Sequence, residues 1–137
     1  MKNFALKIVT PDGLLFDGQA EELIIRTVTG DMGILAGHTD CVAPLGMGLA
    51  TVVVEGEKRY GACIGGMVSV LNGEVKLVPT TFEWAEKIDL DRAKASGEQA
   101  REILADKSAT GTDLCLAEAK LKRALIRQSV AEYKPVK

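Results

Sequence analysis

Residues 67–78 constrain the fold more than any other stretch, because the pair Asn72-Gly73 lies between two short apolar runs, MVSVL and EVKLV. Asn-Gly between alternating apolar residues is the strongest short-range signal for a β-hairpin. Turn residues also separate short apolar runs at residues 11–13 (Pro-Asp-Gly) and 55–57 (Glu-Gly-Glu). The chain up to about residue 84 therefore reads as short strands joined by tight turns.

No helical period interrupts this part of the chain, so the strands favour an antiparallel sandwich or barrel over strand-helix-strand units. Further strands are expected at residues 21–27, 49–55 and 58–64. Between the first two, residues 29–31 (Thr-Gly-Asp) form a turn signal that predicts two short strands joined by an exposed loop tip. We predict a mainly β domain over residues 1–86, an antiparallel β-sandwich of about ten short strands.

From residue 89 the spacing of apolar residues becomes helical, and Asp89 can cap a first helix by accepting backbone N–H bonds of its first turn. Residues 108–111 break the pattern before a second helix, which we expect to be capped by Thr112 or Asp113 and ended by Lys134-Pro135. The residues at helical spacing are Leu90, Ala93, Gly97, Ala100 and Leu104, then Leu114, Ala117, Leu121, Ala124, Gln128 and Ala131. We predict an antiparallel two-helix hairpin over residues 87–137.

The seam of this hairpin consists mostly of alanine and glycine, which lets two helices approach closely but removes little apolar surface from water. The hairpin is therefore expected to be marginally stable, and elements of low stability are where conformational switches occur. The same periodicity is compatible with an ordinary two-helix cap held by the sandwich. Both interpretations stay open at this point.

Composition and cysteine usage bear on several functional classes. Aromatic residues make up 4% of the chain and do not alternate with a basic stripe, which disfavours nucleic acid binding. Cys41, Cys63 and Cys115 are odd in number and far apart, so we expect reduced thiols and neither disulfides nor a metal site. No run reaches transmembrane length and the N-terminus does not resemble a signal peptide. We expect a cytoplasmic chain unless a partner brings it to a membrane.

No residue pattern predicts catalysis. His38 has no acid or nucleophile at a recognisable spacing, and no glycine-rich stretch continues into the Gly-Lys-Ser/Thr of a phosphate-binding loop. On the residues alone, Asp31 is a turn aspartate that bonds its own backbone. We expect no catalytic residue, and measured turnover by the isolated chain would reverse this expectation.

Two stretches resemble a known family. The string GDMGILAGH at residues 30–38, followed by LGMG at residues 45–48, looks like the signature of the epsilon subunit of bacterial F-type ATP synthase. IDLDRA at residues 88–93, which opens the helical hairpin, fits the same family, and the order of these features matches over essentially the whole chain. Ala36 stands where the family often has proline, a local departure that affects the rigidity of the loop.

The resemblance implies a non-catalytic rotor subunit of the central stalk. In that family the sandwich binds the gamma subunit and the membrane ring of c subunits, and the hairpin folds down on the sandwich or extends along gamma, where it inhibits ATP hydrolysis. The implied contact with the c ring is made by Gly30, Asp31, Met32 and Gly33. The implied inhibitory contact, with the alpha and beta subunits of the catalytic head, is made by Lys120, Lys122, Arg123 and Arg127. The implied location is peripheral, on the cytoplasmic side of the bacterial cell membrane, without direct insertion into lipid.

IDLDRA also resembles the nucleotide-binding motif of those epsilon subunits that take up ATP on the folded hairpin. The matching positions are Glu83, Ile88, Asp89, Arg92 and Ala93, with Arg123 and Arg127 on the second helix. Guanidinium groups four residues apart share one helix face and can grip phosphate. ATP is thus expected as a regulatory ligand and no cofactor is required. Gln99 stands where ATP-binding members often have a further arginine, which predicts weakened binding.

Two alternatives accompany these expectations. Arg123 and Arg127 are also typical of a solvated helix face. A free-standing regulatory module that senses ATP would use the same residues without any stalk or ring, and co-purification with a membrane ATPase separates the two functions.

Overall fold

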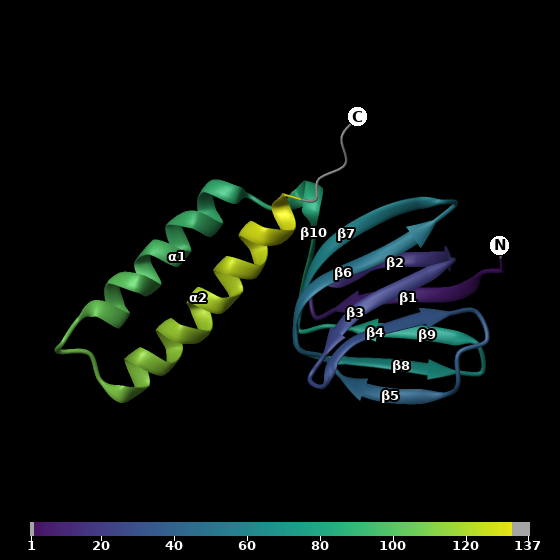
Figure 1. The fold of residues 1–137 in the computed structure, drawn as a ribbon, viewed down its shortest axis with the longest axis horizontal. Helices are drawn as coiled ribbons and strands as arrows, with labels where there is room; N and C mark the ends of the chain where they lie inside the picture. Colours follow the sequence, from purple (N-terminus) through teal and green to yellow (C-terminus); the bar gives the residue numbers. More distant parts are fainter. Residues whose placement is uncertain (1, 133–137) are drawn as a thin grey trace. The chain divides into compact units, whose positions relative to one another are not determined.

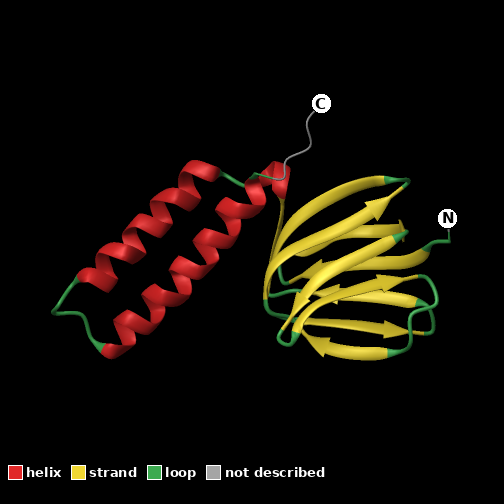
Figure 2. Cartoon of the chain, in the orientation of Figure 1, coloured by secondary structure: helices red, strands yellow, loops and turns green. Residues whose placement is uncertain are grey.

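The computed structural model describes residues 2–132 and divides into two compact units between Trp84 and Ala85. The first unit contains ten strands in two sheets, and the second contains a helical hairpin (Figures 1 and 2). The strands are β1 (Phe4–Thr10), β2 (Gly13–Ala20), β3 (Glu22–Thr27), β4 (Gly30–Leu35), β5 (Cys41–Pro44), β6 (Met47–Val54), β7 (Glu57–Ile64), β8 (Met67–Leu71), β9 (Glu74–Val78) and β10 (Thr81–Trp84). The predicted fold class, a β-sandwich followed by a two-helix hairpin, is confirmed.

The strand order is β2-β1-β9-β8-β5 in one sheet and β10-β7-β6-β3-β4 in the other. Neighbouring strands run antiparallel with one exception among the described strands, β1 and β9, which are parallel with Leu6 opposite Val75. These two strands are far apart in the sequence and no hairpin joins them. Turn signals predict antiparallel neighbours only, so the sequence carried no sign of this pair.

The core of the sandwich lies between the two sheets. Alternate residues of each strand point inward, as in β1, where Leu6 and Ile8 are fully buried. The facing sheet contributes Leu23, Ile25 and Ile34, which are also fully buried. All members of this core cluster belong to residues 4–84, so the sandwich closes its own apolar interior.

Trp84, the last residue of β10, is held inside the sandwich by aromatic contacts. Its ring meets Phe82 edge-on at a centroid distance of 4.9 Å and Phe16 at 6.4 Å. The guanidinium carbon of Arg59 lies 3.8 Å from the centroid of the Trp84 ring, a cation–π contact. Gly61 pairs with Trp84 across β7 and β10, and a side chain there would overlap the Phe82 ring.

The second unit begins with a 3-10 helix, η1 (Ala85–Lys87), followed by α1 (Leu90–Ala105). Asp89 caps α1 as predicted, because its Oδ1 accepts the backbone N–H of Arg92 at 3.1 Å. After α1, Asp106 accepts hydrogen bonds from the backbone N–H and the hydroxyl of Ser108 at 2.9 and 2.7 Å. These two bonds hold the pKa of Asp106 below its ordinary value and close the turn between the helices.

The second helix, α2 (Gly111–Ala131), starts earlier than predicted. Its cap is Thr110, and the prediction of Thr112 or Asp113 is wrong. Asp113 instead completes a capping box: its backbone N–H donates to Thr110 Oγ1 at 3.1 Å, and its carboxylate accepts the Thr110 N–H at 3.2 Å. The expected stop at Lys134-Pro135 lies outside the described residues.

The seam between α1 and α2 is built from small residues, as predicted. Its buried positions are Ala93, Gly97 and Ala100 on α1 and Ala117, Ala124 and Ala131 on α2, and Val130 is the one larger residue buried on α2 within the described part of the chain. Leu104, at the far end of the α1 stripe, is 37% exposed. The hairpin therefore buries little apolar area for its length.

Candidate functional site

The four residues expected to contact a c ring lie at the β3–β4 hairpin. Val28 and Thr29 form its turn and Gly30 begins β4, so Asp31 lies in a strand and the expected loop tip is shifted towards the N-terminus. Arg26 Nε donates to Asp31 Oδ1 at 2.8 Å, and the two side chains are 52% and 62% exposed. Because β4 is an edge strand, this pair stands at the margin of its sheet.

The position of the turn follows from Thr27. Its hydroxyl donates to the carbonyl oxygen of Gly30 at 2.7 Å and accepts the backbone N–H of Thr29 at 3.3 Å. Gly30 has φ +128°, a conformation that side chains disfavour. Beyond it Met32 packs on the core whereas Asp31 and Gly33 are exposed, as strand alternation requires.

The residues expected to bind ATP fall mainly in one half of the hairpin. Gln128 Nε2 donates to the carbonyl oxygen of Ala93 at 3.4 Å, so the first turns of α1 lie beside the last turns of α2. Asp89 and Arg92 are exposed, and Ile88 is buried. The remaining positions are Arg123 and Arg127, which are half-buried one turn apart on α2, and Glu83, which is half-buried in β10 of the sandwich.

The basic residues of α2 differ in what they contact. Lys122 lies 3.8 Å from Glu118 of the same helix, and both side chains are well exposed. Lys120 instead reaches across to α1, where its Nζ donates to Gln99 Oε1 at 2.9 Å. Sequence reasoning missed this contact. The spacing of apolar residues predicts which face of a helix is buried, but it does not predict which polar side chains meet beside that face.

Two carboxylates hold distant turns, and sequence reasoning missed these as well. Glu21 Oε1 accepts the backbone N–H of Gly56 at 2.8 Å, and Asp40 Oδ1 accepts that of Asn72 at 2.9 Å. His38 has its Nδ1 2.8 Å from the carbonyl oxygen of Thr39, an arrangement within its own loop. These groups are engaged in fixing loops and turns of the sandwich.

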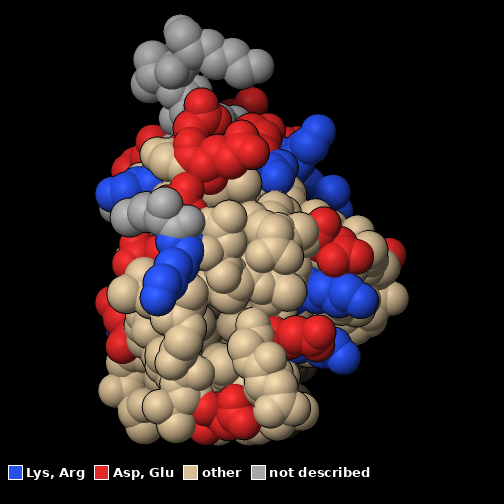
Figure 3. Space-filling model, turned by 90° about the vertical axis from the view of Figure 1, so that its right-hand side faces the viewer, with Lys and Arg blue, Asp and Glu red and all other residues tan. Residues whose placement is uncertain are grey.

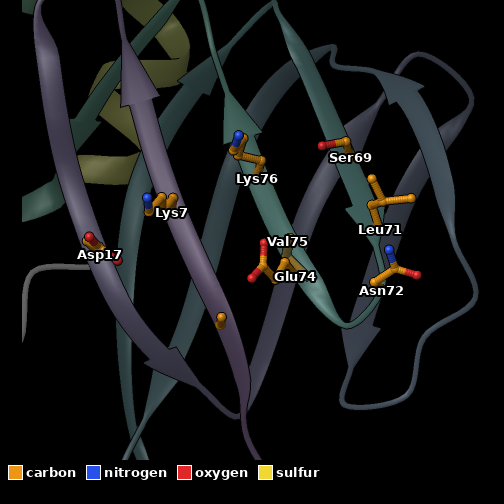
Figure 4. Close-up of a pocket in the computed structure, with 9 residues that line it drawn as sticks. Lys7, Asp17, Ser69, Leu71, Asn72, Glu74, Val75 and Lys76 are labelled. Atoms are coloured by element: carbon orange, nitrogen blue, oxygen red, sulfur yellow. The ribbon is translucent and has the colours of Figure 1, made fainter.

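The outer face of the β2-β1-β9-β8-β5 sheet has a hollow of about 530 Å³ (Figure 4). Lys7 and Lys76 are neighbours there across the parallel pair β1–β9, with Asp17 opposite Lys7 and Glu74 further along β9. None of the residues expected from the sequence to form a site lines it.

In the view of Figure 3, side chains of both charges surround a broad uncharged area.

Within residues 2–132, no cluster of three His, Cys, Asp or Glu side chains could hold a metal ion. The helices of that same range are each too short or too polar to cross a membrane.

Comparison with known proteins identifies the family. A family model for the β-sandwich domain of the ATP synthase delta/epsilon chain matches residues 3–85, and the model for its long α-helix domain matches residues 86–132. The ATP synthase epsilon chain of Shouchella clausii is 36% identical over 134 residues, which cover 98% of each chain. That of Bacillus velezensis is 38% identical over 131 residues, 96% of this chain and 98% of the relative.

A solved structure supports the same assignment. A chain in the cryo-EM structure of the Euglena gracilis mitochondrial ATP synthase, with OSCP, F1 and c-ring, superposes with a TM-score of 0.81 and 26% identity. The match covers 93% of this chain and 80% of that one. The protein therefore belongs to the ATP synthase delta/epsilon chain family. Within it the chain is an epsilon chain, a non-catalytic subunit of F-type ATP synthase, and the resemblance drawn from residues 30–38 and 88–93 is confirmed.

Proposed function

We propose that this chain is the rotor subunit that joins the gamma subunit to the c ring, peripheral to the membrane on its cytoplasmic side. The observation that carries the proposal is the match of both units, over nearly the whole chain, to epsilon chains. The Euglena neighbour, which belongs to an assembly containing a c-ring, supports it. The exposed pair Arg26–Asp31, at the end of the β3–β4 hairpin, supplies polar groups suited to the polar loops of a c ring.

The hairpin regulates ATP hydrolysis in this proposal. When extended along gamma, α2 presents Lys120, Lys122, Arg123 and Arg127 to acidic surface of the alpha and beta subunits. When folded, its helices close on a small-residue seam of low stability. Because little apolar area is lost on opening, modest contacts with a partner are enough to change which form is populated.

Replacing Arg123 and Arg127 together by alanine is expected to weaken the inhibition of hydrolysis by about five- to thirtyfold, since two interfacial ion pairs contribute about 1 to 2 kcal/mol. The residual inhibition should also depend less on salt, because the variant lacks the charges whose attraction to the partner salt would screen. The measurement is ATPase activity of the rebuilt enzyme against salt concentration. The matched control is Arg101→Ala with Lys107→Ala, which removes two exposed cations outside α2; equal effects of the two double variants would contradict the inhibitory contact.

ATP is the proposed regulatory ligand of the folded hairpin, bound near Asp89, Arg92, Arg123 and Arg127. Only the folded form brings the first turns of α1 beside the last turns of α2, so a ligand that contacts both helices favours that form. Gln99 cannot supply a charge to the phosphates. Losing one charge-assisted hydrogen bond costs about 1.5 to 3 kcal/mol, or about ten- to a hundredfold in affinity.

Titration of the isolated chain with ATP, followed by NMR of the helix resonances, tests this proposal. Binding is expected near millimolar concentration, with shifts at Asp89 and Arg127. The Asp89 shift should disappear in Arg127→Ala and persist in Arg101→Ala. Millimolar ATP that moves no resonance near those two residues would rule the site out. Mg²⁺-free ATP and inorganic phosphate, run in parallel, separate recognition of the nucleotide from simple attraction of anions.

A further inference from the structure

Two polar side chains bridge the helices of the hairpin beside the small-residue seam. Lys120 of α2 donates its ammonium to Gln99 Oε1 of α1 at 2.9 Å. Gln128 of α2 donates to the carbonyl oxygen of Ala93 at 3.4 Å and lies over Gly97, where an added Cβ would come 3.3 Å from its Nε2. The folded hairpin thus combines close backbone approach with hydrogen bonds between its two helices.

The Lys120–Gln99 bond joins the two helices, and two ion pairs on the same helices do not. Arg101 pairs with Glu98 inside α1, and Lys122 pairs with Glu118 inside α2. Such pairs persist whether the hairpin is open or closed, so they do not affect the equilibrium between the two forms. The Lys120 bond exists only in the closed hairpin, and it therefore adds to the stability of that form.

We propose that Gln99 is the residue that lets this hairpin close without an anionic ligand, by accepting the Lys120 ammonium directly. The neutral amide oxygen accepts one of the three ammonium N–H groups and brings no second positive charge. An arginine at position 99 would remove the acceptor and place a guanidinium beside Lys120, which disfavours closure unless an anion lies between the two cations. This inference rests on the regulatory function proposed above, because the bond stabilises the closed form, in which α2 is not extended towards the catalytic head.

The distance between two labels reports closure in the isolated full chain. Lys94→Cys near the start of α1 and Ser129→Cys near the end of α2 place labels at exposed positions that lie close together only when the hairpin is closed. Cys41 and Cys115 are replaced by serine in every sample. Cys63 is kept, because burial raises the pKa of its thiol to about 12 and the thiolate is the reactive form.

Gln99→Ala and Lys120→Met should each lower the ratio of closed to open hairpin by about two- to tenfold, the range of one partly exposed hydrogen bond to a charged group. The double variant should lose no more than either single variant, since both remove the same bond. The matched controls are Glu98→Ala and Lys122→Met, which remove charged neighbours whose partners lie within one helix. Controls that open the hairpin as much as Gln99→Ala, or additive losses in the double variant, would overturn the proposal.

Gln99→Arg tests the proposal by adding a positive charge beside Lys120, whereas the variants above remove the bond. It should open the hairpin without ligand and restore closure with 5 mM ATP or tripolyphosphate, concentrations chosen to exceed a roughly millimolar affinity. The parent chain should stay closed whether or not anion is present. A Gln99→Arg chain that stays closed without anion would also overturn the proposal.

ATPase activity of the rebuilt enzyme separates this inference from the regulatory function. If Gln99→Ala opens the isolated hairpin, it should strengthen inhibition of the enzyme by a similar factor. Opening without any change in inhibition would support the bond and contradict the proposed inhibitory role of the hairpin.

Discussion

Replacing Gly66 by alanine is expected to destabilise the sandwich by about 2 to 5 kcal/mol. Gly66 lies between β7 and β8 with φ +94°, which costs an alanine about 1 to 2 kcal/mol, and its new Cβ would overlap the carbonyl oxygen of Val78. Relieving that overlap adds about 1 to 3 kcal/mol. The backbone cannot simply move away, because the Gly66 carbonyl accepts the N–H of buried Leu45 at 2.8 Å.

Gly73→Ala is the matched control for this effect. Gly73 has a similar φ of +79° in the β8–β9 turn, but an added Cβ there has no neighbour within 4 Å. Gly73→Ala should lower the free energy of unfolding by about 1 kcal/mol, which is the conformational cost alone. Urea unfolding of the full chain, followed by the fluorescence of Trp84, measures both variants. Equal losses would mean that the approach of Gly66 to the Val78 backbone does not constrain the sandwich.

The sequence predicts the sandwich well where turn residues lie between apolar runs. The Asn72-Gly73 turn and the turns near residues 11–13 and 55–57 join the strands that they were expected to join. Two short strands, β5 (Cys41–Pro44) and β10 (Thr81–Trp84), were not placed individually, because four residues are too few to show a period. The parallel β1–β9 pair joins strands that are far apart in the sequence, and local sequence patterns do not predict such long-range pairing.

The candidate site was only partly accessible to sequence reasoning. Spacing along α2 correctly put Arg123 and Arg127 one turn apart, and Asp89 was recognised as a helix cap. The turn signal at residues 29–31 predicted a loop, but the side chain of Thr27 moves the turn to Val28 and Thr29. The Lys120–Gln99 bond joins two helices at 21 residues' separation, so it follows from tertiary structure alone.

Removing the hairpin is expected to leave a folded sandwich and a more active hydrolase. The core cluster lies entirely within residues 4–84, so a chain of residues 1–86 keeps every apolar contact of its interior. It should unfold cooperatively and still assemble with the rest of the enzyme. ATP hydrolysis should rise at least as much as in the Arg123→Ala, Arg127→Ala double variant, by about five- to thirtyfold or more, because the truncation removes both arginines together with the rest of the hairpin.

Synthesis should change little in that truncated enzyme, because the proposed rotor function assigns the transmission of rotation to the sandwich. Loss of cooperative unfolding in residues 1–86 would show that the strands depend on the helices. If the truncated chain fails to join the enzyme, the hairpin, and not the sandwich, carries the binding surface for gamma or the c ring.

ATP hydrolysis and synthesis by the parent enzyme, rebuilt with the full chain, with residues 1–86 and without either, test the regulatory rotor function most directly. The rotor function predicts that both chains restore coupled synthesis and that only the full chain suppresses hydrolysis. Equal hydrolysis with the full and truncated chains, or synthesis restored without any chain, would contradict it.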